Sequence, residues 1–485
     1  MSNGKEMSVI PQDTGDAVIN QLDHSGHMRR IRSSQNGMKV FQDELVNGDS
    51  VHDYAPERKL GWKTTGMIQI GDVVGMGILT IATAFTQLGW VLAVLFLTLM
   101  CPVNVYMGVV LSKAQKIIPA AFTYEQMARF AVMKKWFTIF VEMTFFLYLI
   151  LTLGGYILAL TEALQMVFFE SSLCAPIFGV ISVGILVFPV QIRTLSELKI
   201  LVWINFCLIT SSVLMAAIYM AINMDAHHIK YPAVTDIFPS HLTWTEFFNG
   251  ISKVTFAYLG AYIYLEIMSE MQQPGDFPKA FIISAPFQYG MYIFVGSVGY
   301  LYNGEVTSDI ILKEVSPVTN PGTFRAAAIL LALHLVISYC IKGICLCRSI
   351  HAKISPETVN DFSRRGRIIW MALSLSILAS SYIFSNAIPL FDKMSSLLGA
   401  LFAPLLGYIF PPIFLLFARR RAGVATSTME YIVIGSIVVF ALILLFVGTV
   451  ANVISFIDAM KAQSQVPFQC KSISYLDEYM HEHAA

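Results

Sequence analysis

An apolar run near the amino terminus reads Ile70-Gly71-Asp72-Val73-Val74-Gly75-Met76-Gly77-Ile78-Leu79, so one acid and three glycines interrupt a hydrophobic segment. Each glycine weakens a helix by about 1 kcal/mol relative to alanine. A second run reads Phe256-Ala257-Tyr258-Leu259-Gly260-Ala261-Tyr262 and again has a glycine within a hydrophobic segment. Both runs predict helices that break in an apolar environment.

The composition of the whole chain indicates that this environment is lipid. Of the 485 residues, 56% are hydrophobic and 13% are charged, well below the roughly 25% charge of a soluble domain. A transmembrane helix needs about 20 mainly apolar residues. Eleven segments meet this requirement, approximately 64–84, 88–111, 136–168, 173–191, 199–222, 246–268, 280–302, 324–347, 367–388, 394–417 and 430–457. We therefore predict an all-α polytopic membrane protein with eleven transmembrane helices.

Positive residues in alternate loops predict the orientation, because lysine and arginine stay on the cytoplasmic side. With the amino terminus in the cytoplasm, the opposite loops hold little beyond Lys230, Lys313 and Lys393. The cytoplasmic loops then hold Lys113, Lys116, Arg129, Lys134, Lys135, Arg193, Lys199, Lys279, Arg348, Lys353, Arg364, Arg365, Arg367, Arg419, Arg420 and Arg421. An odd number of spans places the carboxyl terminus outside the cytoplasm. The net charge is zero, so no excess of positive charge indicates a nucleic acid partner.

The same pattern divides the chain into three parts. Residues 1–60 are polar and predict a disordered cytoplasmic tail, residues 61–457 hold the eleven-helix transporter domain, and residues 458–485 form an extracytoplasmic tail. Cys174 and Cys470 fall in polar ends on the extracytoplasmic side, where a disulfide between them can form. The expected location is the plasma membrane.

The two irregular segments are the first and the sixth, and the interval of five is informative. A repeat of five spans must recur upside down in the membrane, and inverted repeats with broken first helices are a common transporter architecture. Unwound backbone exposes N–H groups that suit a carboxylate and C=O groups that suit an ammonium. A zwitterionic amino acid fits both. The alternative is that the glycines only allow close helix packing, as the spacing of Gly71 and Gly75 would.

Residues 60–457 resemble the amino acid/auxin permease family, and within it the fungal neutral amino acid permeases of system N type. Gly75-Met76-Gly77-Ile78-Leu79 resembles the first-helix motif G-x-G-[IV]-L of the family. The sixth-helix stretch F-A-Y…E-I…E-M…D-F-P-K-A is matched by Phe256-Ala257-Tyr258, Glu266-Ile267-Met268-Ser269-Glu270-Met271 and Asp276-Phe277-Pro278-Lys279-Ala280. Relatives often have a proline after the first motif, whereas Thr80-Ile81-Ala82-Thr83 follows here. This departure predicts a straighter outer half of the first helix.

This resemblance implies a sodium-symporter-like core built as a 5+5 inverted repeat, with helices 1 and 6 broken. It also implies import of neutral aliphatic and aromatic amino acids, coupled to a cation gradient. The proton is expected as the coupling cation rather than sodium. Substrate-binding residues are expected at the two breaks: Gly75, Met76, Gly77, Ile78, Phe256, Tyr258, Leu259 and Gly260.

Ionisable groups within the apolar segments are the candidates for ion coupling, because a charge at the bilayer centre costs at least about 2.5 kcal/mol and usually faces a cavity. Alternatives stay open for each: Asp72 pairs with Lys63 or Lys342, Lys342 reaches the interface with its stem in lipid, and Glu266 pairs with a basic loop residue. The candidates are Asp72, Ser338, Lys342 and Glu266.

Other activities have less support in the sequence. His334 is the only histidine within a predicted span, which leaves no basis for a metal cluster in the membrane. Catalytic motifs such as a nucleophile elbow or a phosphate-binding loop are missing, so we expect neither an enzyme nor a cofactor. Two alternatives remain: transport of another small solute on the same fold, and an amino acid receptor that signals through its tail.

Overall fold

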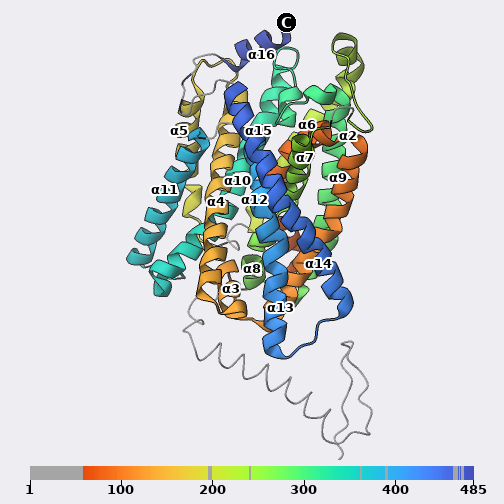
Figure 1. Cartoon of the computed structure of the whole chain (residues 1–485). Coiled ribbons are helices and arrows are strands. Elements are labelled where there is room, and N and C mark those ends of the chain that lie inside the picture. The colour runs from red at the N-terminus through yellow and green to blue at the C-terminus, as the bar shows by residue number, and fades with distance from the viewer. Residues whose placement is uncertain are drawn as a thin grey trace, which may run out of the picture.

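The computed structural model describes residues 58–194, 199–239, 242–360, 363–387, 391–462, 468, 470 and 474–484, and every regular element within them is a helix (Figure 1). Leu60 and Met271 form an isolated β-bridge. The α-helices are α2 (Trp62–Ile117), α3 (Tyr124–Val132), α4 (Lys135–Val167), α5 (Ala175–Leu186), α6 (Lys199–Lys230), α7 (Trp244–Ala257), α8 (Ala261–Ser269), α9 (Phe277–Asn303), α10 (Pro321–Ile354), α11 (Arg364–Ala387), α12 (Phe391–Phe402), α13 (Phe410–Ala422), α14 (Thr428–Ile443), α15 (Thr449–Ala462) and α16 (Tyr475–Ala484). Short π-helical turns at Ala403–Ile409 and Leu444–Gly448 join α12 to α13 and α14 to α15.

Eight helical stretches of the described chain are long and apolar enough to cross a membrane. This confirms the prediction of an all-helical, multi-pass membrane protein. α2 contains two of the predicted segments, because the chain bends at Gly89 with a φ of 69°, which glycine adopts without strain. The N–H groups of Trp90 and Val91 donate at this bend to the carbonyls of Asp236 and Ile237, at 3.1 and 3.2 Å.

The predicted break in the first segment is absent, so this prediction was wrong. Helical backbone angles continue from residue 62 to residue 88, through Gly75 and Gly77. A break in lipid requires new partners for every freed backbone group, whereas a glycine costs a helix only about 1 kcal/mol. A Cβ atom on Gly77 would lie 2.7 Å from the Cα atom of Ala257. The glycine therefore serves the close packing of α2 against α7.

The sixth predicted segment does contain an interruption. α7 ends at Ala257 and α8 begins at Ala261, so residues 258–260 leave the helical pattern near the middle of the bundle. α7 starts with a capping box in which the Thr243 hydroxyl accepts from the Glu246 N–H and the Glu246 side chain accepts from the Thr243 N–H. Caps of this kind fix where a helix begins. α7 packs along α2, and Ala257 at its end lies against Gly77.

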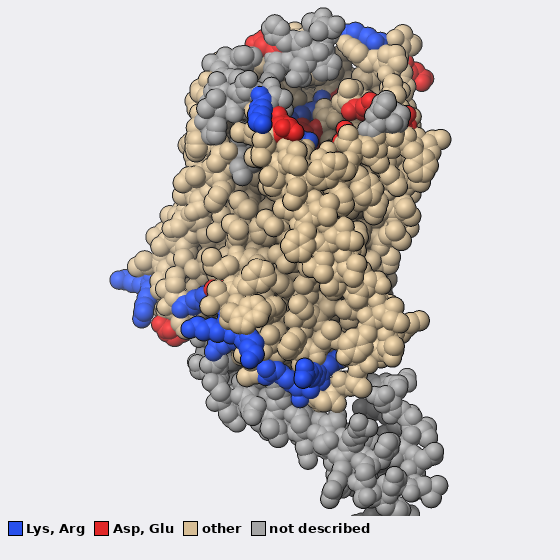
Figure 2. All heavy atoms as spheres, in the orientation of Figure 1, with Lys and Arg blue, Asp and Glu red and all other residues tan. Residues whose placement is uncertain are grey.

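The helices form one bundle whose outer surface is apolar. α2 packs against α7 and α9, and α10 packs against α4 and α6. Figure 2 shows a belt without visible charged side chains between two charged ends. Large apolar residues such as Ile222 and Phe446 are exposed on the outside, 77% and 67% respectively. Soluble monomers rarely expose contiguous apolar surface of this kind, whereas a lipid-facing surface requires it.

One end of the bundle, which we call the basic end, carries Arg419, Arg420 and Arg421 in the last turn of α13, where Arg421 donates to the carbonyl of Val132 at the end of α3 (Figure 1). The other end, which we call the disulfide end, holds the bond between Cys174 and Cys470, with an S–S distance of 2.08 Å. Residues 1–57 of the predicted tail lie outside the described residues. Lys59 and Leu60 are bonded to the carbonyl of Glu270 through their N–H groups, at 2.9 Å each.

α16 is held at the disulfide end by more than the disulfide. The Leu476 N–H donates to the Phe169 carbonyl at 3.0 Å, and the Tyr475 ring lies 5.5 Å from that of Phe324. Lys313 lies nearby and pairs with Glu162 at 2.7 Å and Asp309 at 2.8 Å. Burial lowers the pKa of Lys313, but these two carboxylates outweigh it and raise the pKa well above its usual value.

Replacement of Cys174 with serine is expected to lower the melting temperature of the detergent-solubilised protein. A disulfide that closes a long loop contributes about 2–4 kcal/mol, and this bond joins residues 296 positions apart. Cys207→Ser is the matched control, since Cys207 is an exposed free thiol. Equal melting temperatures for Cys174→Ser and the unmodified protein would contradict a stabilising role.

Candidate functional site

A buried ion pair lies beside the interruption between α7 and α8. The Lys342 ammonium of α10 binds the carboxylate of Asp72 in α2, and the two side chains are 4% and 1% exposed. Lys342 also donates to the Asp72 carbonyl at 3.3 Å and to the Tyr156 hydroxyl at 3.1 Å. Tyr262, in the first turn of α8, donates its hydroxyl to the Asp72 carboxylate at 2.6 Å. Lys342 therefore does not reach the interface, and the pairing alternative for Asp72 is the observed one.

Two aromatic rings enclose the ammonium. Its Nζ atom lies 4.9 Å from the ring centre of Tyr156 and 5.7 Å from that of Tyr262. Cation–π attraction grows as water is removed, to about 2 kcal/mol or more per contact. The two charges thus neutralise each other and the remaining donors and acceptors are satisfied, which is how a charge is tolerated at membrane depth.

A neutral polar cluster adjoins this pair. The Ser338 hydroxyl lies 3.3 Å from the Gly71 carbonyl and 3.3 Å from Nε2 of His334, and it accepts from the Asn205 side chain at 3.1 Å. Tyr292 donates its hydroxyl to the Val73 carbonyl at 3.0 Å. Carbonyls of three successive α2 residues, 71 to 73, therefore accept bonds from other helices without a break in α2.

The interruption in the sixth segment brings two helix ends together. α7 ends with carbonyl groups that carry partial negative charge, and α8 begins with N–H groups that carry partial positive charge. The Ala257 carbonyl accepts from the Tyr292 hydroxyl at 2.6 Å. A Cβ atom on Gly260 would lie 2.7 Å from the Val73 side chain, so glycine at this position lets α8 approach α2.

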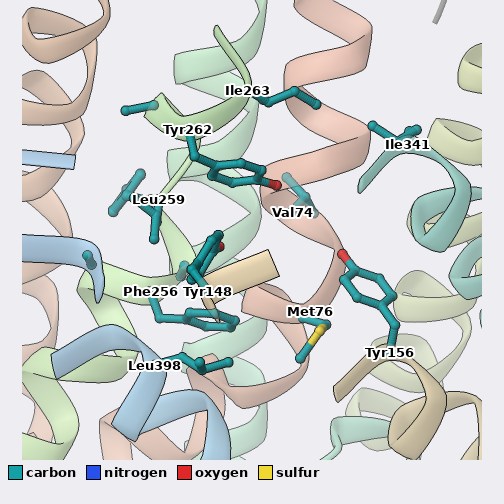
Figure 3. Close-up of a cluster of buried hydrophobic side chains, with 14 of the residues drawn as sticks. Val74, Met76, Tyr148, Tyr156, Phe256, Leu259, Tyr262, Ile263, Ile341 and Leu398 are labelled. Atoms are coloured by element: carbon teal, nitrogen blue, oxygen red, sulfur yellow. The ribbon is translucent and has the colours of Figure 1, made fainter. Parts of the chain in front are cut away.

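Aromatic and apolar side chains from α2, α4, α7 and α8 point toward one another next to this interruption (Figure 3). Tyr148 lies with its ring centre 5.0 Å from that of Tyr262 and 5.7 Å from that of Phe402. Met76, Phe256 and Leu259 complete the cluster and are all buried. Such a wall fits an uncharged side chain.

Sequence reasoning missed the α4 residues of this cluster. Tyr148, Thr152 and Tyr156 are spaced i, i+4 and i+8, which places them on one helical face. All three are buried. A polar stripe at this spacing in an otherwise apolar helix was the signal that could have found them.

The predicted substrate residues are brought together only in part. Gly75 faces Tyr156, since a Cβ atom would lie 2.8 Å from its hydroxyl. Ile78 is fully buried. The Tyr258 hydroxyl donates to the Leu97 carbonyl at 3.2 Å, so it bonds to the second half of α2. Of the predicted coupling residues, Asp72, Ser338 and Lys342 lie together, and Glu266 lies one helical turn beyond Tyr262 on α8.

A second buried ion pair lies between this cluster and the disulfide end. Lys253 of α7 is fully buried and pairs with Asp392 of α12 at 2.6 Å. Thr83 of α2 lies between them, 2.9 Å from the Lys253 ammonium and 2.8 Å from the Asp392 carboxylate. Sequence reasoning missed Lys253, although a lysine inside the sixth apolar segment was a clear signal.

Comparisons with known proteins find relatives of this chain by sequence. The model of the family described as "Transmembrane amino acid transporter protein" matches residues 58–455. The N amino acid transport system protein of Neurospora crassa is 24% identical over 392 residues, covering 80% of this chain and 81% of that protein. A transmembrane transporter of Fusarium pseudograminearum is 22% identical and covers 90% of both chains.

A solved structure shares the fold. The crystal structure of MhsT in complex with L-phenylalanine superposes with a TM-score of 0.52 at 16% identity, covering 83% of this chain and all of that chain.

Lys342→Met is expected to destabilise the protein by about 3–5 kcal/mol, because it leaves the Asp72 charge buried without a partner. The double variant Asp72→Asn/Lys342→Met removes both charges, and we expect it to recover most of this loss. Thermal unfolding in detergent measures the stability of Lys342→Met, of Asp72→Asn and of the double variant. If the losses of the single variants simply add in the double variant, the pair does not stabilise the fold through charge neutralisation.

Proposed function

The chain belongs to the transmembrane amino acid transporter protein family, and from this we propose that it imports neutral aliphatic and aromatic amino acids by proton symport. The observation that carries the proposal is the Asp72–Lys342 pair, buried next to the interruption between α7 and α8. This family contains transporters, so the protein is a transporter rather than an enzyme.

The substrate class follows from the surroundings of the interruption. The end of α7 offers carbonyl groups to an ammonium, and the start of α8 offers N–H groups to a carboxylate. Met76, Phe256 and Leu259 form an apolar wall without a charged side chain among them, which favours neutral substrate side chains. The relatives support an amino acid: one is named for N amino acid transport, and MhsT was solved with L-phenylalanine.

Charge balance links the substrate to a proton. The Asp72 carboxylate neutralises Lys342. A proton on Asp72 would leave the Lys342 ammonium buried without its partner, at a cost that a substrate carboxylate offsets. Proton and amino acid therefore favour each other's binding. The Lys342 ammonium also bonds to the Asp72 carbonyl, beside the Ser338 hydroxyl. It thus occupies the place where a sodium ion would find oxygen ligands, which favours the proton over sodium as the coupling cation.

The proposed topology has eleven spans in a 5+5 inverted repeat, with the interruption in the sixth span as its one broken helix. Residues 61–457 form the transporter domain, between a cytoplasmic tail and an extracytoplasmic one. Disulfides form in oxidising compartments and positive residues stay in the cytoplasm. The disulfide end therefore faces outward and the basic end faces the cytoplasm, in the plasma membrane.

Uptake of labelled leucine and phenylalanine into permease-deficient cells that express this chain tests the proposal. We expect saturable uptake that is faster at acid pH, because protonation of Asp72 is part of loading, and equal with sodium or choline in the medium. Lysine and glutamate serve as charged controls and should not enter. Uptake that requires sodium would overturn proton coupling, and no uptake of either neutral amino acid by protein at the cell surface would overturn the substrate class.

Gly77→Leu is expected to abolish this uptake, because the new side chain overlaps the Ala257 backbone at the contact between α2 and α7. Gly435→Leu is the matched control, since a Cβ atom on Gly435 has no heavy atom within 4 Å among the described neighbours. Uptake and surface biotinylation of both variants measure the effect. Normal flux in Gly77→Leu would remove this contact from the mechanism.

A further inference from the structure

A polar seam runs from the Asp72–Lys342 pair toward the basic end, between α8 and α10. Tyr262 and Glu266 lie on α8 and Glu270 is the residue directly after it. Their spacing of i, i+4 and i+8 places them on one side of the helix, and α8 packs against α10. At the end of the seam near the centre of the bundle, Tyr262 binds Asp72. At the end of the seam near the basic end, Glu270 pairs with Arg348 of α10 at 3.0 Å.

Glu266 occupies the middle of this seam. Its side chain is buried, 7% exposed, and its Oε1 atom has no hydrogen-bond partner within the described part of the chain. Buried polar atoms are almost always bonded, so an orphan oxygen calls for a ligand or a water. Four titratable or charged groups face Glu266: Glu125 of α3, Glu270 directly after α8, and Cys345 and Arg348 of α10.

A small cavity lies against this side chain. It has a volume of about 30 Å³, and its wall includes Glu266, Glu270, Arg348, Thr123 and Gln126. A polar cavity of about 10–15 Å³ already holds one water. Tyr262 and Glu266 lie four residues apart, about 6 Å along the helix, and the cavity extends from Glu266 toward Glu270 and Arg348. The structure thus places a carboxyl group and room for water between Asp72 and the basic end.

We infer that Glu266 is the acceptor of the proton that leaves Asp72 on the cytoplasmic side, an assignment that rests on the proposed proton symport. The proton passes from the Asp72 carboxyl past the Tyr262 hydroxyl to the Glu266 carboxylate, and Asp72 returns to its ionised pair with Lys342. Glu266 then gives the proton to cytoplasmic water past Glu270 and Arg348. One proton leaves Asp72 and one reaches the cytoplasm, and no other bond changes.

Glu266→Gln separates proton release from substrate binding. With a gradient of about one pH unit, one proton per substrate accumulates a neutral amino acid about tenfold, since tenfold corresponds to about 1.4 kcal/mol. In proteoliposomes we expect Glu266→Gln to lose this tenfold accumulation of leucine. Exchange of external labelled leucine for internal leucine needs no net proton release, and we expect it to stay at the rate of the unmodified protein.

Two variants control for the loss of a buried acid. Glu125 is also 7% exposed and also has a carboxyl oxygen without a hydrogen-bond partner among the described residues, but it does not line the cavity. Leucine accumulation should therefore persist in Glu125→Gln. Glu266→Asp keeps the titratable group and should restore accumulation in part. Loss of exchange in folded Glu266→Gln, or accumulation as in the unmodified protein, would overturn the assignment. Absence of exchange in the unmodified protein would instead contradict the proposed function.

Discussion

The burial of Asp72 and Lys342 in a membrane is the constraint on which the site depends. An isolated charge at that depth costs several kcal/mol, so both charges must be neutralised and all their donors and acceptors occupied. Four helices supply the partners: α2 and α10 the charges, α4 the Tyr156 hydroxyl, and α8 the Tyr262 hydroxyl. A shift of any one of these helices removes a bond from a buried charge, which ties their positions together.

This constraint also explains why one helix breaks and the other does not. Tyr262 reaches Asp72 from the first turn of α8, and α8 takes its own direction because α7 stops at Ala257. α2 needs no break, since its carbonyls at residues 71 to 73 accept side-chain bonds while the helix continues. Asymmetry between the first and sixth segments therefore arises from how each satisfies its backbone in lipid.

The sequence allowed the class of fold to be predicted and pointed to Asp72 and Lys342 as charges within apolar segments, because hydropathy and charge are local signals. It did not allow the role of the glycines to be decided. The sequence around Gly77 is the same whether this glycine breaks α2 or lets Ala257 pack against it. Only the position of α7 in the structure distinguishes these two roles. The Lys342 partner, Tyr156 and the cavity beside Glu266 depend on three-dimensional packing between distant segments, which no window of sequence contains.

The broken segment takes part in three polar contacts among the described residues. Lys253 on α7 pairs with Asp392 toward the disulfide end, Tyr262 on α8 binds Asp72 at the centre, and Glu270, the residue after α8, pairs with Arg348 toward the basic end. In the proposed transport cycle, the interruption at residues 258–260 would let one half tilt and open its own ion pair while the other half keeps its pair closed. A continuous helix would move both pairs at once and open a path through the membrane. On this proposal, the interruption gives access from one side at a time.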